Sequence, residues 1–131
     1  MKSSVNKYKF FNYIQNSPFG NYYIPARFQY VILKDYYKKI NQDFVLPQGE
    51  AYFSKKKIRL NTLINELKKY DNLILISMFM FPQLKKDRLI LFKKLIDKKV
   101  KVHLIFENLI IQNKRDYSEI ENIFKLQKFT K

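Results

Sequence analysis

Short apolar runs alternate along this chain with segments that carry apolar residues on one helical face. Four such runs are present, and each is followed by a stretch whose apolar residues recur with a period near 3.6. This alternation of strand and helix signals indicates a parallel sheet with crossover connections. We therefore expect an α/β fold, a single three-layer domain with a four-stranded parallel sheet in the order 2-1-3-4, by analogy with flavodoxin-like folds.

The expected elements fill the chain without a second domain. The predicted strands are 7–15, 43–47, 73–78 and 100–106, and the predicted helices are 27–40, 58–70, 87–98 and 116–129. The run 73–78 is the most apolar, so we expect it at the centre of the sheet, where helices cover both faces. The length of 131 residues suits one domain spanning 1–131, and we expect 1–6 to form a flexible tail.

The net charge of +15 raises the question of a nucleic-acid partner. The lysines are spread over predicted helix faces and loops, and arginine occurs only at Arg27, Arg59, Arg88 and Arg115. Proteins that read bases and phosphates favour arginine for its planar, bidentate donor group. We therefore favour a solvated basic surface, and nucleic-acid binding stays open as the less favoured alternative.

The composition also bears on cofactors and location. The chain has no cysteine, one histidine and only two glycines, so thiolate metal sites and glycine-rich phosphate loops are absent. We expect no cofactor and no zinc, while a Mg²⁺ site bound by oxygen ligands stays open. No apolar run has the length of a membrane span and the start of the chain is polar, so we expect a cytoplasmic protein.

Polar residues lie at the ends of all four predicted strands. They are Ser17, Glu50, Ser77 and Glu107. The carboxyl ends of parallel strands lie along one edge of the sheet, and ligands of open α/β sheets bind there. The sequence therefore predicts a binding site at this edge.

Three of the polar residues near this edge could transfer protons. Glu50 and Glu107 could divide acid and base roles if their surroundings separate their pKa values. His103 shares strand parity with Glu107 and could point to the same end of the sheet. The alternative is that each carboxylate caps a helix or pairs with a lysine, and that the histidine is a hydrogen-bonded core residue.

The remaining candidates would bind a ligand. Ser17 and Ser77 have no neighbouring base and no nucleophile-elbow motif, so we expect them to donate hydrogen bonds to a ligand or to cap a helix rather than to act as nucleophiles. Arg27 and Gln29 begin the first predicted helix beside Ser17, and an arginine at a helix start suits an anion such as a phosphate or carboxylate. The alternative for Arg27 is an ordinary surface arginine.

The order of several segments resembles one known family. The resembling residues are Asn12-Tyr13-Ile14, Ser17-Pro18, Pro25, Arg27, Gln29, Asp35-Tyr36, Glu50, Tyr52, Ser77-Met78-Phe79-Met80-Phe81-Pro82, Arg88, His103, Glu107 and Ile120-Glu121. Together they are similar to the sporadic carbohydrate cluster proteins, small bacterial proteins encoded among surface-polysaccharide genes. The resemblance implies a role in assembling or modifying lipopolysaccharide or capsule, without implying a particular reaction.

A fainter resemblance is to the catalytic domain of serine recombinases. Ser17 follows the first strand, where their nucleophile lies, and Arg59 begins the second helix much as one of their arginines does. The stretch 79–83 lacks the arginines that such enzymes need to stabilise a developing phosphate charge. We take this second resemblance as a statement about fold alone, and we add Arg59 to the candidate ligand-binding residues.

These observations support three functional hypotheses. The first is a protein of surface-carbohydrate biosynthesis that binds, and could modify, an anionic sugar or sugar-nucleotide at the carboxyl edge. The second is a non-enzymatic partner protein in the same pathway, or a homo-oligomer, with the apolar stretch Met78 to Pro82 as its interface. The third is nucleic-acid binding through the lysine-rich surface.

Overall fold

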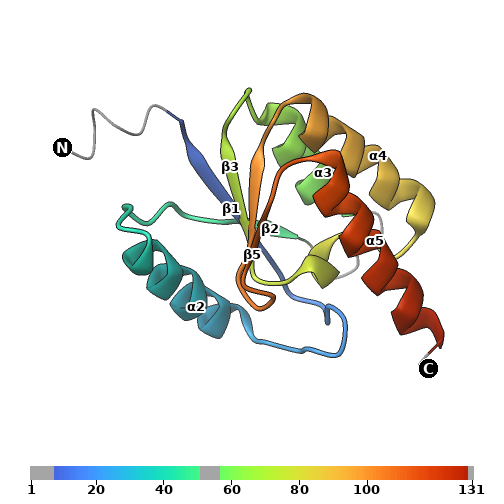
Figure 1. The fold of residues 1–131 in the computed structure, drawn as a ribbon. Coiled ribbons are helices and arrows are strands. Elements are labelled where there is room, and N and C mark those ends of the chain that lie inside the picture. Colours follow the sequence, from blue (N-terminus) through green and yellow to red (C-terminus); the bar gives the residue numbers. More distant parts are fainter. Residues whose placement is uncertain (1–7, 51–56, 130–131) are drawn as a thin grey trace.

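The computed structural model describes residues 8–50 and 57–129, and its centre is a five-stranded mixed sheet (Figure 1). The strands are β1 (Phe10–Gln15), β2 (Gln48–Glu50), β3 (Asn72–Leu75), β4 (Lys101–Leu104) and β5 (Leu109–Ile111). Their order across the sheet is β2-β1-β3-β4-β5. The β1–β2, β1–β3 and β3–β4 pairs are parallel, and only β5 runs antiparallel to its neighbour β4.

The fifth strand corrects the predicted four-stranded, wholly parallel sheet. The sequence interpretation extended the fourth strand over 100–106, but β4 ends at Leu104 and the chain reverses directly afterwards. Asn108 adopts a left-handed conformation with φ 56° in this turn, and asparagine tolerates that region better than most residues. The three apolar residues of β5 then return along β4 as a short hairpin.

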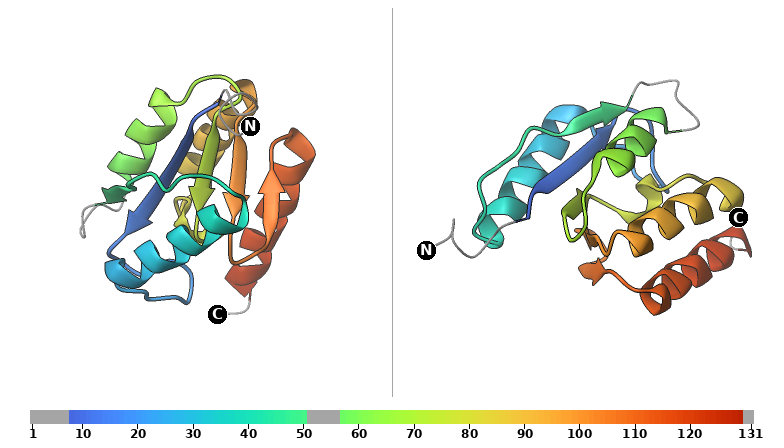
Figure 2. Two further views of the ribbon diagram at one scale, coloured as in Figure 1. Left: turned by 90° about the vertical axis from the view of Figure 1, so that its left-hand side faces the viewer. Right: turned by 90° about the horizontal axis from the view of Figure 1, so that it is seen from above.

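Helices cover the two faces of the sheet unequally. They are α2 (Ala26–Lys39), α3 (Ile58–Glu66), α4 (Lys85–Asp97), α5 (Lys114–Phe129) and the 3₁₀ helix η1 (Met78–Met80). Figures 1 and 2 show α2 alone on one face, with α3, α4 and α5 together on the other. Each of the four α-helices overlaps a predicted one. No helix in the described part of the chain is long and apolar enough to cross a membrane.

The central strand of the sheet is buried along its whole length. All four residues of β3 are buried, and its position between β1 and β4 confirms the expectation of a central apolar strand. The second strand is displaced from its predicted place: 43–47 form no strand, and the pairing with β1 begins only at Gln48. The predicted tail 1–6 lies outside the described residues.

The segment after β3 is part of the core. Met78, Met80 and Phe81 are almost completely buried, because η1 turns their side chains inward. The prediction that Met78 to Pro82 forms an interface patch is therefore wrong, since these side chains are not available to a partner.

A buried ion pair joins α4 to α5. Arg88 is only 1% exposed and donates two hydrogen bonds to the carboxylate of Glu121, at 2.8 and 2.5 Å. Its remaining terminal nitrogen donates to the carbonyl oxygens of Pro82 and Gln83, and its guanidinium lies 3.9 Å from the ring centre of Phe124. Arg88 thus fixes both helices to the loop that follows η1.

Candidate functional site

The carboxyl edge of the sheet brings Ser77 and Glu107 together, as their positions after strands predicted. The Ser77 hydroxyl donates to one carboxylate oxygen of Glu107 at 2.8 Å, and the backbone N–H of Met78 donates to the other at 3.0 Å. Ser77 also accepts a hydrogen bond from the backbone N–H of Phe79 and is completely buried. Both side chains therefore hold the β4–β5 turn against η1, and Ser77 has no surface to offer a ligand.

Gln29 likewise serves the fold. Its side-chain nitrogen donates to the carbonyl oxygens of Gln15 (2.6 Å) and Ile24 (2.7 Å), and its side-chain oxygen accepts from the Gln15 N–H at 3.2 Å. The residue is completely buried. Gln29 therefore fastens the start of α2 to the end of β1, and we do not retain it among the ligand-binding candidates.

A buried ammonium group lies at the carboxyl end of β1. Lys57 is 8% exposed and donates to the side-chain oxygen of Gln15. The side-chain nitrogen of the same glutamine donates to the carbonyl oxygens of Ser17 (3.2 Å) and Pro18 (3.0 Å). Sequence reasoning did not single out Lys57. Its signal was its place immediately before a helix.

Three further predicted residues of this edge are Arg27, Arg59 and Glu50. Arg27 and Arg59 are exposed near the starts of α2 and α3, and the Arg27 guanidinium lies 5.1 Å from the ring centre of Phe28. Glu50 ends β2 and is paired in register with Gln15. The side chain of Glu50 lies outside what the structure describes.

His103 faces α2 and is held by two side chains. Its Nδ1 lies 2.6 Å from the Tyr36 hydroxyl, and its Nε2 lies 3.0 Å from the amide oxygen of Asn72. Because that oxygen can only accept, the imidazole proton is assigned to Nε2 and Tyr36 donates to Nδ1. Burial, reinforced by the positive charge of Lys101, lowers the pKa of His103 from 6.5 to about 4. The imidazole is therefore neutral at neutral pH.

A pocket of about 450 Å³ opens beside His103, at the amino ends of the parallel strands. It is lined by Tyr8, Phe10, Ile40, Gln42, Tyr70, Asn72, Lys101, His103, Ile110 and Gln112. Aromatic rings and amide side chains thus surround a neutral imidazole. We call this cavity the His103 pocket.

The His103 pocket and Glu107 are at different places along the strands. His103 is paired in register with Ile74, whereas the contacts of Glu107 are with Ser77 and Met78, three and four residues farther along. At about 3.3 Å per residue this separates the two levels by roughly 10 Å. The expectation that His103 and Glu107 point to one end of the sheet is therefore not met.

The uneven helix cover explains why the pocket is open. The face that carries His103 has only α2 above it, and α2 lies near β1 (Figure 1). At the amino ends of the parallel strands, Tyr8 and Tyr70 pair with ring centres 5.6 Å apart, and Ile110 of β5 stays 56% exposed. Within residues 8–50 and 57–129, no group of three or more histidine, cysteine, aspartate or glutamate side chains is placed to hold a metal ion.

No family model matches the chain, and no curated protein is significantly similar to it in sequence.

Proposed function

We propose that the protein binds a sugar, preferentially one with an anionic group, in the His103 pocket, and that it serves surface-carbohydrate biosynthesis. The observation that carries the proposal is the convergence of three aromatic rings and three amide side chains on one pocket of about 450 Å³. Small-molecule sites commonly have volumes of 300–1,000 Å³, with apolar walls and a few placed polar groups.

The lining suits the two chemical faces of a sugar. A sugar ring presents apolar C–H groups that can lie against Tyr8, Phe10 or Tyr70. Its hydroxyls need both donors and acceptors, and an amide side chain supplies both. Asn72 at the start of β3 and Gln112 just after the end of β5 supply such amides.

Positive charge near the pocket favours an anionic sugar. Lys101 lines the pocket, and the ammonium groups of Lys69 and Lys99 each lie 5.8 Å from the ring centre of Tyr70. A uronic acid or sugar phosphate would gain from these charges, although salt would weaken the gain because the lysines are near the surface.

The proposal concerns binding and assigns no reaction. Both ring nitrogens of His103 already have partners, so the imidazole supports the pocket wall instead of accepting a proton from a ligand. The acid–base roles suggested by the sequence for Glu50, Glu107 and His103 would require them in one cleft. The biosynthetic context comes from the family resemblance, and the pocket chemistry is compatible with it.

Calorimetric titration with glucuronate, UDP-glucuronate and glucose tests the proposal. We expect saturable binding that is tighter for the anions, and a loss of about tenfold or more in Tyr70→Ala and in Lys101→Gln. Arg27→Ala is the matched control, because it removes a charge at the carboxyl edge without touching the His103 pocket, and it should bind normally.

Two results would contradict the proposal. If Arg27→Ala or Ser17→Ala removed binding while Tyr70→Ala did not, the sugar would lie at the carboxyl edge beside the buried Lys57 ammonium. If no sugar bound but a short oligonucleotide did so at physiological salt, the basic surface would be the functional one.

A further inference from the structure

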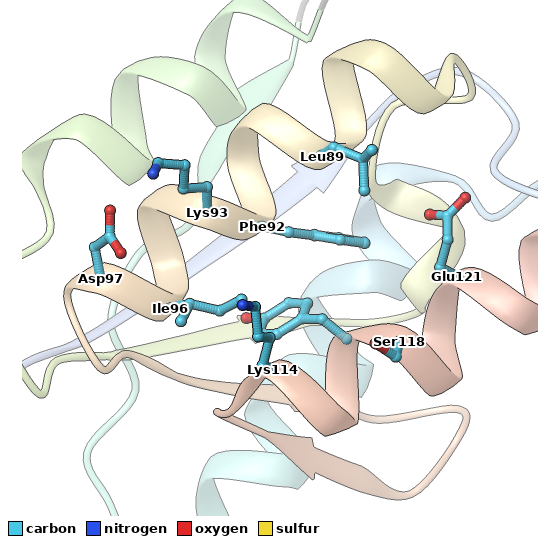
Figure 3. A pocket seen from close by; sticks show the side chains of 9 residues that line it. Leu89, Phe92, Lys93, Ile96, Asp97, Lys114, Ser118 and Glu121 are labelled. Atoms are coloured by element: carbon cyan, nitrogen blue, oxygen red, sulfur yellow. The ribbon is translucent and has the colours of Figure 1, made fainter.

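A second pocket, of about 500 Å³, lies between α4 and α5 on the opposite side of the sheet from α2 (Figures 1 and 3). Leu89, Phe92 and Ile96 of α4 supply apolar wall, and Tyr117 of α5 adds its ring. Figure 3 shows the Phe92 side chain in the gap between the two helices, with Lys93 and Asp97 toward one end and Glu121 toward the other. We call this pocket the α4–α5 groove.

The charges around the α4–α5 groove favour an anion. Glu121 is already neutralised by its paired hydrogen bonds from Arg88. Lys93 and Lys114 line the groove, and neither forms an ion pair with a carboxylate within residues 8–50 and 57–129. Among the residues that line the groove, two ammonium groups therefore face one remaining carboxylate, that of Asp97, while Asp116 lies outside the lining.

A buried hydroxyl in the groove wall lacks a hydrogen-bond partner. Tyr117 is only 3% exposed, and its hydroxyl has no partner among the described residues. Burial, and secondarily the charge of Asp116, raises the pKa of Tyr117, so the hydroxyl stays protonated as a donor. Buried donors are rarely left unpaired, because the lost hydration is not recovered. The hydroxyl itself has almost no accessible surface, so a ligand oxygen would satisfy this donor by displacing the side chains that cover it.

We propose that the α4–α5 groove binds a small amphipathic anion, an aromatic carboxylate, with its ring against Phe92 and Ile96 and its carboxylate toward Lys114 and the Tyr117 hydroxyl. The volume fits a small molecule, and the apolar wall with few polar groups is typical of small-molecule sites. This inference is independent of the sugar site, because no residue lines both pockets.

The test is an amide-detected NMR titration of the full chain with 3-phenylpropionate and with its uncharged amide, 3-phenylpropanamide. We expect saturable shifts confined to 89–97 and 114–121, with the carboxylate binding at least fivefold more tightly than the amide. The double variant Lys93→Gln/Lys114→Gln should abolish that preference. Lys86→Gln removes an exposed charge from α4 outside the groove and should preserve it.

The variant Tyr117→Phe distinguishes between a ligand-binding role and a structural role of the Tyr117 hydroxyl. Removing an unpartnered buried hydroxyl should leave the melting temperature of the free protein unchanged or higher, while weakening 3-phenylpropionate binding severalfold. The inference would be overturned if neither compound gave saturable shifts at millimolar concentration, or if both bound equally with no effect of the lysine changes. A lower melting temperature for Tyr117→Phe would show that the hydroxyl has a partner in the fold.

Discussion

At the residue scale, His103 gives the sharpest contrast between sequence and structure. It is the only histidine, and sequence reasoning could name it without choosing between a proton-transfer group and a core residue. The choice depends on Tyr36, which is 67 positions away in the chain, and on Asn72, which is 31 positions away. Neither pairing has a local sequence signal, because both arise from how α2 and β3 pack around β4.

The pKa of His103 is directly measurable, because one histidine gives one set of imidazole signals. We expect the NMR titration midpoint of the folded protein near pH 4, well below the ordinary value of 6.5, because burial disfavours the charged ring. A midpoint near 6.5 would show that the imidazole is solvated and would contradict the buried contacts with Tyr36 and Asn72.

The same shift predicts acid sensitivity. In the unfolded chain the histidine takes up its proton as the pH falls below 6.5, whereas the folded protein does so only near pH 4. The unfolded state therefore binds more protons in this interval, and stability should fall as the pH drops from 6.5 to about 4, by on the order of 3 kcal/mol.

Urea denaturation across this pH range checks the acid sensitivity. His103→Gln should flatten the pH dependence between 6.5 and 4, since glutamine does not titrate. The hydrogen bonds from Arg88 lower the pKa of Glu121, so protonation of Glu121 in acid also reduces the folding stability. This loss of stability should persist in His103→Gln. An unchanged slope in His103→Gln would remove the histidine from the explanation.

At the element scale, Arg88 and Glu121 determine how α4 and α5 lie together. Arg88→Met would leave a buried carboxylate without its partner, and we expect a loss of about 3–5 kcal/mol in the free energy of unfolding. Arg88→Met/Glu121→Leu should recover much of it, because replacing both charges removes the desolvation cost. Denaturant titration measures both.

The exposed pair of Arg115 and Glu119 provides a control on the same helix. Its closest atoms are 3.9 Å apart and both side chains are solvated, so Arg115→Met should change the free energy of unfolding by less than about 1 kcal/mol. Equal effects of Arg88→Met and Arg115→Met would contradict the structural role given to the buried pair.

The loop between β1 and α2 depends on a glycine. Gly20 has φ +62°, and a Cβ atom added there would lie 2.8 Å from the ring of Phe79. Gly20→Ala should therefore lower the stability by about 1–3 kcal/mol, through backbone strain and a clash. Gly49→Ala is the matched control, with its nearest neighbour at 3.8 Å. If thermal denaturation found both variants alike, the loop would not pack on η1 as described.

Helices were more predictable than strands in this chain. The apolar stripes of 27–40 and 87–98 fell within a few residues of α2 and α4, because each helix buries one face against the sheet. The helix expected over 58–70 ends at Glu66, since Leu67 is already extended with ψ 142°. The strands β2 and β5 are three residues each, too short for alternation to reveal them.

At the scale of the whole molecule, the arrangement of layers decides where cavities can form. Three helices on one face leave the α4–α5 groove between them, and the single helix on the other leaves the amino end of β4 uncovered (Figure 2). The strand–helix alternation indicated the α/β class and a largely parallel sheet. It could not indicate how α2 would be positioned, because that depends on the buried contacts of Gln29 and Tyr37 with distant residues.

The fold class predicted which strand ends meet, but not where the pocket lies. Ser77 and Glu107 do meet, because the ends of adjacent parallel strands coincide at one edge. Their hydrogen bonds are used within the fold. The pocket that is lined by aromatic rings and amide side chains lies at the opposite edge of the sheet. Strand order alone does not distinguish a polar strand end that caps a turn from one that faces a cavity.

The measurement that tests the central claim most directly is an NMR titration of the His103 imidazole signals with glucuronate. Binding in the His103 pocket should move these signals saturably, together with the backbone amides of Tyr70, Asn72 and Gln112, and leave Ser17 and Glu107 unmoved. Saturable binding that shifts Ser17, Arg27 and Lys57 while the imidazole signals stay fixed would contradict the account and place the ligand at the carboxyl edge.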